Sequence, residues 1–336
     1  MSAGKREQVV TVKTLARKAG VSPATVSLAL NGDPRVAAKT RGKISRLAGK
    51  LKYVPNNFGR ALQSSRSRLV GYVIQKITTS FFSEILQGMG ECATEHGYGL
   101  LVAVTGSSRE KDGEQLRLFR EKRLDGLVVS GVHPATHDLL LDLNESGLPV
   151  VICSGVSFDK RIPYVVTDDF KGGVIAASHL LGLGHEKIAY YGGSPRASLR
   201  YQGVRAEFEK HGIKKVAACG NEQELRSVLQ SPAGRPTAIV AYSDRLAIDA
   251  KHVIETSGLC VPGDISLLGY DNLWTDLLPE FNLTSIAPHK EEIGRISMLM
   301  LMELINGREV KPTLVEPRIY PRASTARRGG ARKARA

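Results

Sequence analysis

Residues 10–32 read VTVKTLARKAGVSPATVSLALNG and predict two short helices joined by a tight turn. Thr11 is a candidate N-cap for the first helix, and Gly20 is a candidate stop. Ser22 can cap the second helix, with Pro23 at the first helical position, where proline costs least. Two short helices around a glycine-containing turn are typical of a helix-turn-helix.

The second helix has two different faces, neither of which carries a charge. Its apolar face, turned toward the first helix, consists of Val26, Ala29 and Leu30. The opposite face forms an exposed stripe of Pro23, Ala24, Ser27, Leu28 and Asn31. A third helix, expected at about residues 38–51, would brace the pair.

The positive charge of the chain is concentrated at its ends. The formal net charge is +14, and residues 1–68 hold fifteen Lys/Arg against two acids. Residues 322–336 add six Lys/Arg without an acid and are of low complexity, so we expect a disordered basic tail there. A mildly acidic body with two basic ends indicates a polyanionic partner.

The rest of the composition excludes several classes of protein. The four cysteines are widely spaced, which favours buried free thiols over a metal site or a disulfide framework. No apolar run is long enough for a membrane span, and no signal peptide is visible, so we expect a cytoplasmic protein without a cofactor.

From Leu69 onward, short apolar runs alternate with amphipathic stretches. The predicted strands are residues 69–74, 98–104, 125–130, 149–153, 187–191, 237–242 and 265–270. The predicted helices are residues 81–96, 109–123, 170–181, 198–211, 244–257 and 290–306. This alternation predicts an α/β body of two lobes, each a doubly wound parallel sheet, with a cleft at the carboxyl ends of the strands.

The helical region alone would also fit a small basic module with solvated charges. However, residues 10–56 contain A-x-x-A-G-V-S-x-x-T-V-S, then Asn31, K-T-R and Y-x-P-N, and so resemble the DNA-binding headpiece of the LacI/GalR family. The later stretches LRYQGV, SDRLAIDA, VPGDISLLGYDN and RAST resemble the effector domain of the same family. The resemblance covers residues 10–325.

The resemblance implies that the second helix enters the major groove of DNA. Leu28 stands where many relatives carry arginine, which favours methyl contacts to thymine over a bidentate contact to guanine. Ala37 departs from the Ser or Thr that often caps the third helix. Including the hinge, the implied DNA-binding residues are Thr11, Ser22, Pro23, Ala24, Thr25, Ser27, Leu28, Asn31, Arg35, Lys39, Thr40, Asn56 and Leu62, with further phosphate attraction from Arg41.

Residues 55–68 resemble the hinge helix of the family. Leu62 matches a leucine that wedges into the minor groove, although such a residue can also pack on its dimer mate. Gly59 replaces the usual alanine and weakens a helix, so we expect the hinge to fold only on DNA.

The body resembles periplasmic sugar-binding proteins, with an effector between the lobes. The implied effector-binding residues are Phe81, Phe82, Ser154, Arg200, Ser243, Asp271 and Trp274. Ser243 stands where asparagine is common, and Ser154 is the weakest match. An internal salt bridge remains the alternative role for Arg200 and Asp271, and core packing remains the alternative for Trp274.

The sequence therefore predicts a headpiece at residues 8–54, a hinge at 55–68, a two-lobed body at 69–325 and a basic tail at 326–336. We expect a homodimeric transcriptional regulator that acts as a repressor, binds a near-palindromic double-stranded operator on the nucleoid and responds to a sugar-like effector. Activation, or a nucleoside-type corepressor, stays open.

A sugar-binding protein or an enzyme without a regulatory role is the remote alternative. The headpiece and the lack of an export signal argue against a transport protein. No complete nucleophile-elbow, P-loop, dinucleotide-binding or zinc-protease motif is present. His133 and His137 flank a proline-containing turn and fit a solvated pair better than a metal site. Asp168 and Asp169 form an acidic pair, but members of the family hold acidic residues at this place without any catalysis.

Overall fold

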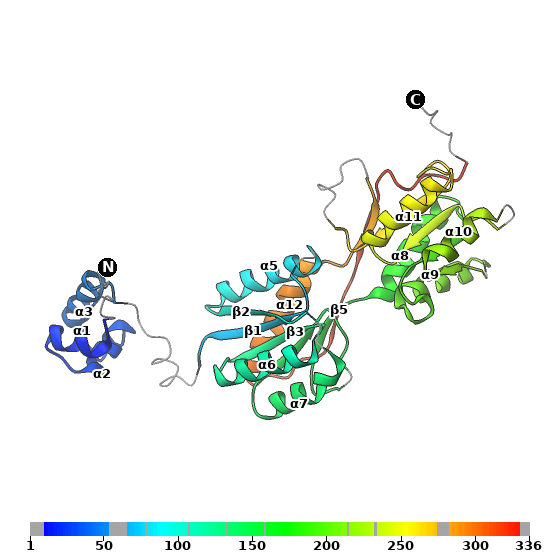
Figure 1. Cartoon of the computed structure of the whole chain (residues 1–336). Helices are drawn as coiled ribbons and strands as arrows, with labels where there is room; N and C mark the ends of the chain where they lie inside the picture. Colours follow the sequence, from blue (N-terminus) through cyan, green and yellow to red (C-terminus); the bar gives the residue numbers. More distant parts are fainter. Residues whose placement is uncertain are drawn as a thin grey trace, which may run out of the picture. The chain divides into compact units, whose positions relative to one another are not determined.

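The computed structural model describes residues 10–53, 66–77, 80–106, 108–131, 133–157, 159–213, 215–231, 234–273 and 282–329. The chain divides into two compact units, residues 1–67 and 68–336. In its described part, the first unit is helical and the second consists of two α/β lobes (Figure 1).

The described part of the first unit is a bundle of three helices, α1 (Val12–Ala19), α2 (Pro23–Leu30) and α3 (Ala38–Lys50). The helices pack around one apolar core. Its buried members are Leu15, Ala16, Ala19, Val26, Ala29, Val36, Ile44 and Ala48. The predicted helix-turn-helix and its bracing helix are thus confirmed, and we call residues 10–53 the headpiece.

Side-chain caps fix the ends of the first two helices. The Thr11 hydroxyl accepts a hydrogen bond from the Thr14 amide at 3.2 Å, and Gly20 ends α1 with a left-handed φ of 71°. The Ser22 hydroxyl accepts from the Thr25 amide at 3.1 Å. These contacts confirm the predicted caps, whereas Ala37 provides no side-chain cap for α3.

The second unit contains two six-stranded sheets, in which the strands follow one another in the same relative order. The first lobe has the strand order β11-β5-β4-β3-β1-β2, and the second has β12-β10-β9-β8-β6-β7. The first-lobe strands are β1 (Leu69–Ile74), β2 (Gly99–Val104), β3 (Gly126–Ser130), β4 (Val150–Cys153), β5 (Tyr164–Thr167) and β11 (Thr313–Val315). The second-lobe strands are β6 (Ile188–Tyr191), β7 (Ala217–Cys219), β8 (Ala238–Ala241), β9 (Ser266–Tyr270), β10 (Thr284–Ala287) and β12 (Arg318–Tyr320).

Helices cover both faces of each sheet, as expected for doubly wound sheets (Figure 1). In the first lobe, one face carries α5 (Ser80–Glu95) and α12 (Lys290–Ile305), and the other carries α6 (Arg109–Glu121) and α7 (His137–Glu145). In the second lobe, α8 (Asp169–Gly182) and α9 (Leu199–Lys210) oppose α10 (Glu222–Gln230) and α11 (Asp244–Thr256). Two 3₁₀ turns are η1 (Pro134–Thr136) and η2 (Pro195–Ala197). None of the described helices combines the length and apolarity needed to cross a membrane.

The chain passes from one lobe to the other at three places. The crossings follow β5, β10 and β11, so that α12 returns to the first lobe and β12 ends in the second. β12 is antiparallel to β10, whereas β11 runs parallel to β5. The two lobes are therefore both discontinuous in sequence.

The predicted strands and helices of the body are confirmed with shifts of at most a few residues. The sequence did not predict β5, β7, β10, β11, β12, α7 or α10. β5, β7, β11 and β12 are only partly buried, and β10 begins with Thr284 and Ser285, so none of these strands is a run of four buried apolar residues like the predicted β4, β6 and β8.

Residues 322–328 correct part of the prediction of a disordered basic tail, because hydrogen bonds join this segment to the second lobe as far as Arg328. The Ser324 hydroxyl donates to the Leu267 carbonyl at 2.6 Å, and the Ala326 carbonyl lies 2.9 Å from His185 Nε2. β12 belongs to the second-lobe sheet and therefore places the following residues against this lobe, in spite of their basic composition. Residues 330–336 lie outside the described part.

The cysteines are free in the described structure, and three of them, Cys92, Cys153 and Cys219, are buried as expected. Cys260 is exposed, contrary to the expectation of buried thiols. Its thiol lies in the loop after α11 and donates to an Asp264 carboxylate oxygen at 3.1 Å. The loop position explains the exposure.

Candidate functional site

The outward face of α2 is uncharged and mostly accessible. Pro23, Ala24 and Asn31 are exposed, whereas Ser27 and Leu28 are half-buried. Leu28 packs against the headpiece core, so the expectation that it faces solvent is only partly correct. A short apolar and hydroxyl-bearing helix of this kind can enter a groove without desolvating a charge.

The hydroxyl groups beside this face already make local contacts. Ser22 Oγ lies 2.9 Å from Thr25 Oγ1 and also caps α2, and Thr11 caps α1. A hydroxyl has one proton and two lone pairs, so a cap can still bond to a phosphate oxygen. Lys39 is exposed, and Thr40 is half-buried.

The arginines near α2 have internal partners that the sequence did not reveal. Arg35 forms a forked ion pair with Asp33, with Nε–Oδ1 at 3.0 Å and Nη2–Oδ2 at 2.8 Å. The hydrogen bonds from Arg35 lower the pKa of Asp33 to about 2. Arg41 Nη1 donates to the carbonyls of Asp33 and Val36. In the described structure these guanidinium groups therefore organise the turn before α3.

Three of the predicted site residues, Asn56, Leu62 and Trp274, lie outside the described residues, as does Gly59 of the expected hinge helix. All of the other predicted site residues are described.

Arg200, near the start of α9, lies between two tyrosine rings in the second lobe. Its guanidinium carbon is 3.6 Å from the ring centroid of Tyr270 and 4.7 Å from that of Tyr242. Its Nη1 donates to the Tyr242 carbonyl at 2.6 Å. The stacking and the hydrogen bond fix the plane of the guanidinium.

Two carboxylates compensate the charge of Arg200. Nε lies 3.1 Å from Asp169 Oδ1, but its N–H does not point at that oxygen, so the contact is an ion pair without a hydrogen bond. Nη1 lies 3.7 Å from Asp271 Oδ1. The internal salt bridge left open by the sequence is thus present, and the side chains of Arg200 and Asp271 keep 12% and 16% of their surface exposed.

Asp271 is held in a strained loop after β9. Its φ is 98° and that of Asn272 is 45°, both in the left-handed region. Buried Asp244 accepts from the Leu273 amide at 2.7 Å and from the Ser285 hydroxyl at 2.6 Å. Ser285 Oγ in turn accepts from the Asn272 amide at 3.1 Å. These bonds offset the strain and orient Asp271.

Burial governs the titration of this cluster. It raises the pKa of Asp271 to about 7, although Arg200 opposes the shift, and it raises the pKa of Asp244 to about 6. Burial also opposes the charge of Arg200, but Asp169 and Asp271 hold the pKa of its guanidinium above the usual value. Asp271 is therefore a less stable anion than Asp244.

The raised pKa of Asp271 predicts a pH-dependent stability. Between about pH 4 and pH 7 the folded chain holds a proton that the unfolded chain has lost, so Asp271 reduces stability as the pH rises through that window. Asp271→Asn removes this contribution. Relative to wild type, the variant should gain up to about 1.4 kcal/mol per pH unit across the window, measured by urea unfolding at pH 5 and pH 7.5. The exposed Asp249→Asn is the control; parallel pH profiles for all three proteins would contradict the prediction.

The two predicted serines lie at strand ends in different lobes. Ser243 Oγ accepts from the Leu246 amide at 3.3 Å and caps α11, beside the Arg200 cluster. Ser154 follows β4 in the first lobe with φ 57°, and its amide donates to the Val165 carbonyl at 2.7 Å. The structure groups Ser243, but not Ser154, with Arg200 and Asp271.

Phe81 and Phe82 lie in the first turn of α5 in the first lobe. Their rings meet edge to face with centroids 5.3 Å apart, and both are half-buried against the lobe core. They pack on the core of the first lobe, and no described contact joins them to Arg200, so their role as a wall of the effector site stays a prediction.

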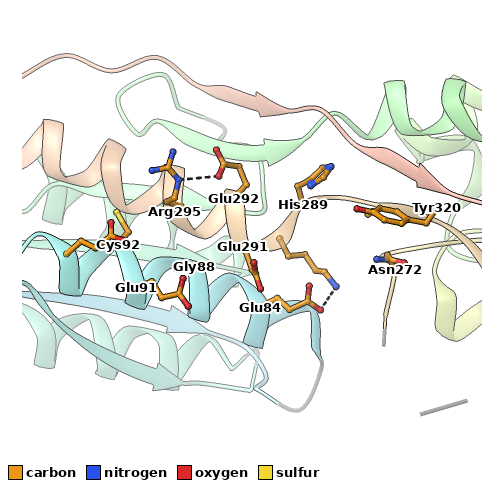
Figure 2. Close-up of a pocket in the computed structure, with 13 residues that line it drawn as sticks. Glu84, Gly88, Glu91, Cys92, Asn272, His289, Glu291, Glu292, Arg295 and Tyr320 are labelled. Carbon is orange, nitrogen blue, oxygen red and sulfur yellow. Dashed lines mark hydrogen bonds and ion pairs between the residues drawn. The ribbon is translucent and has the colours of Figure 1, made fainter. Parts of the chain in front are cut away.

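A pocket of about 400 Å³ is lined by residues of α5 and α12 and also by Asn272 and Tyr320 of the second lobe (Figure 2). Two of its lining residues, buried Lys290 and Glu84, form an ion pair at 2.6 Å. His289 Nε2 is buried and has no hydrogen-bond partner among the described residues. None of the predicted effector-binding residues lines this pocket, although Asn272 neighbours Asp271.

The sequence did not identify Asp169, Tyr242 and Tyr270 as partners of Arg200. Each is adjacent to a quoted motif or a noted acidic pair, so proximity to Ser243 and Asp271 was an available signal. The Lys290–Glu84 pair joins residues far apart in the chain, and the sequence contains no signal for it.

Both parts of the chain match known protein families. Residues 11–56 match the family described as bacterial regulatory proteins, lacI family, and residues 67–323 match the periplasmic binding proteins and sugar binding domain of LacI family. The chain is 31% identical to the HTH-type transcriptional repressor PurR of Photobacterium profundum, over 91% of this chain and 97% of that protein. It is 30% identical to the HTH-type transcriptional repressor CytR of Escherichia coli, over 92% and 94%. The crystal structure of the lac repressor dimer bound to operator and the anti-inducer ONPF is similar with a TM-score of 0.81 and 25% identity, over 95% of this chain and 100% of that one.

Proposed function

Because the chain belongs to the LacI family of bacterial regulatory proteins, we propose that it is a homodimeric repressor of transcription that binds a near-palindromic operator. Its operator affinity is controlled by a small-molecule effector, and it has no catalytic role. Family membership also supports action on the nucleoid in the cytoplasm. The observation that carries the proposal is the uncharged, accessible face of α2 on a three-helix headpiece.

In this proposal the α2 face reads base edges. Pro23, Ala24, Ser27 and Leu28 supply methyl, methylene and hydroxyl contacts in the major groove. The groups proposed to bind phosphates or neighbouring base edges are Thr11, Ser22, Thr25, Asn31, Arg35, Lys39, Thr40 and Arg41. Binding of Arg35 to a phosphate would compete with its ion pair to Asp33. Asn56 and Leu62 of the hinge complete the proposed set, with Leu62 as the minor-groove wedge.

An exposed apolar edge supports the dimer. β2 is the outer strand of the first-lobe sheet, and its Leu101, Val102 and Val104 side chains are 38%, 39% and 50% exposed. An unpaired edge with apolar side chains favours pairing with another chain. A second copy of this protein would present the same edge and match the symmetry of a palindromic operator.

The effector is proposed to contact Arg200 and Asp271 of the second lobe, with Ser243 and Trp274 nearby and with Phe81, Phe82 and Ser154 as the first-lobe wall. A hydroxyl-rich ligand such as a sugar could donate to the Asp271 carboxylate. A ligand that prefers one arrangement of the lobes changes operator affinity by linkage. Whether the ligand releases the repressor from the operator or strengthens its binding depends only on which arrangement of the lobes the ligand prefers.

Selection from random-sequence DNA tests the proposal. The full-length protein should enrich a near-palindromic site that binds at least about 1,000-fold more tightly than scrambled DNA of the same length at the same salt concentration. Failure to enrich any sequence, with the headpiece folded, would contradict operator binding. The selected site then serves for effector screening, in which a compound that alters operator affinity should also raise the melting temperature.

Leu28→Arg should change the preferred operator. A guanidinium on the α2 face can make a bidentate contact to guanine, worth about 1–3 kcal/mol of discrimination, which leucine cannot make. Selection with the variant should therefore gain guanine at one position in each half-site. Lys50→Arg, at an exposed residue of α3, is the control. An identical selected site for wild type and Leu28→Arg would show that residue 28 does not face the bases.

A further inference from the structure

Tyr242 presents an accessible ring beside Arg200. The Tyr242 side chain is 37% exposed, whereas Tyr270, the other ring at Arg200, is 1% exposed. The Tyr242 amide donates to the Tyr191 carbonyl at 2.9 Å, and its carbonyl accepts from Arg200. Gly193 approaches the ring so closely that a Cβ there would lie 3.2 Å from Cδ2. The ring is therefore fixed in position but not covered.

Tyr242 lies at the point where the winding of the second-lobe sheet reverses. It follows β8, which pairs with β6, and these two strands lead to α11 and α9 on opposite faces of the sheet. Small molecules bind outside the carboxyl ends of parallel strands at this point. The accessible ring is thus placed where a ligand of this lobe would lie.

The charged groups linked to Arg200 through Asp169, Asp271 and Asp244 have more carboxylates than cations. The cations are Arg200, Lys290 and Arg322, and the carboxylates are Asp169, Asp271, Asp244 and Glu84. Lys290 is committed to Glu84, the ion pair drawn in Figure 2. Arg322 donates to Asn272 Oδ1 and the Leu283 carbonyl. Even with Asp271 protonated, the described set holds as many carboxylates as cations, so none of its cations is left uncompensated.

This charge balance disfavours an anionic ligand. Arg200 is the cation in contact with the ring, and it is already compensated by Asp169 and Asp271. A phosphate or carboxylate would have to displace one of these side chains or lie beside it in a poorly solvated site. A hydroxyl group has no such cost, because it can donate to either carboxylate.

We infer that the effector is an uncharged, hydroxyl-bearing ring compound that packs a flat face on Tyr242, and that phosphorylated forms of the same compound are excluded. The inference rests on the proposed function and defines the ligand of that site more narrowly. Apolar sugar faces and nucleobases both pack on aromatic rings, so a sugar and a nucleoside share the required chemistry.

Matched pairs of compounds test the inference with the full-length protein and its selected operator. The pairs are glucose and glucose 6-phosphate, fructose and fructose 1-phosphate, ribose and ribose 5-phosphate, adenosine and AMP, and cytidine and CMP. Direct binding by calorimetry and release or recruitment of operator are both measured. The unphosphorylated member of at least one pair should bind, and its phosphorylated partner should bind at least about 100-fold more weakly. The pair that responds distinguishes a sugar from a nucleoside.

Variants of Tyr242 test whether its ring contacts the effector. Tyr242→Ser should weaken binding of the compound that responds in the panel about tenfold. Tyr242→Phe should retain most of the affinity, because the ring stays and the backbone contact to Arg200 is unchanged. Leu118→Ser, at a residue of similar exposure on α6, is the control and should change nothing.

Three results would overturn the inference: a phosphorylated compound that binds more tightly than its parent, unchanged affinity in Tyr242→Ser, or no binding by any member of the panel. In the last case operator binding would be retained, so only the ligand assignment would fail. Loss of operator selection as well would instead contradict the proposed function.

Discussion

Gly173→Ala should destabilise the second lobe by about 3 kcal/mol or more. A Cβ at position 173 of α8 would lie 2.0 Å from the Arg200 carbonyl oxygen and 2.8 Å from the Val204 amide nitrogen of α9. Both neighbours are helix backbone and cannot rotate away as a side chain would. The two helices must separate, which opens the apolar contact beneath them and displaces Arg200 from its two tyrosine rings.

Gly182→Ala on the same helix is the matched control. No atom lies within 4 Å of a Cβ at position 182, so the variant should be neutral or gain up to about 1 kcal/mol from the better helix propensity of alanine. Urea unfolding followed by circular dichroism measures both variants. Equal stability of Gly173→Ala and wild type would show that α8 and α9 are not in backbone contact.

The same device holds α5 to α12 in the first lobe. A Cβ at Gly88 would lie 2.1 Å from the Glu291 carbonyl oxygen, and one at Gly294 would lie 2.0 Å from that of Ile85. The sequence shows glycines in amphipathic stretches but not their partners, since these contacts join helices that are far apart along the chain. Periodicity predicts that a helix exists and which face is apolar; it does not predict how closely two helices approach.

The strands that the sequence did not predict likewise depend on contacts between residues far apart in the chain. Apart from the edge strand β2, the confirmed strands are buried apolar runs such as LVGYVI, which stand out against polar helices. β10, β11 and β12 contain three or four residues each, and Thr284 and Ser285 of β10 are buried because they bond to the 322–325 segment and to the loop of Asp271. A sequence pattern that contains such hydroxyl groups predicts a loop, because the distant partners that satisfy the buried hydroxyls cannot be seen in a single sequence.

At the site, the resemblance indicated Arg200 and Asp271 because the family motif runs through them, and the structure brings them together. It did not indicate Asp169 or Tyr242, which contact Arg200 from α8 and from the end of β8. Their roles depend on the spatial meeting of three βα connections. Likewise, the sequence predicts that Arg35 is available to bind DNA, whereas in the structure its guanidinium forms an ion pair with Asp33.

Arg200→Ala should destabilise the protein by about 3–5 kcal/mol at pH 7.5, because it removes one partner of a buried charge cluster and leaves Asp169 and Asp271 uncompensated. The effect should depend on pH. Arg200 opposes the rise in the pKa of Asp271, so its loss raises that pKa further above the unfolded value. The folded variant then gains protons that the unfolded chain lacks, and its disadvantage shrinks as the pH falls from 7.5 toward 5.

The control for this substitution lies on the same helix. Arg205 pairs with Glu209 one turn away at 3.0 Å, and its side chain is 53% exposed, so Arg205→Ala should cost less than about 1 kcal/mol at either pH. Urea unfolding at pH 5 and pH 7.5 separates the two cases. Because the headpiece has its own core, Arg200→Ala should also keep affinity for the selected operator while losing the effector response. A variant that unfolds no more easily than Arg205→Ala would show that Arg200 does not compensate the buried carboxylates. A variant that still responds to effector would show that Arg200 does not contact the ligand.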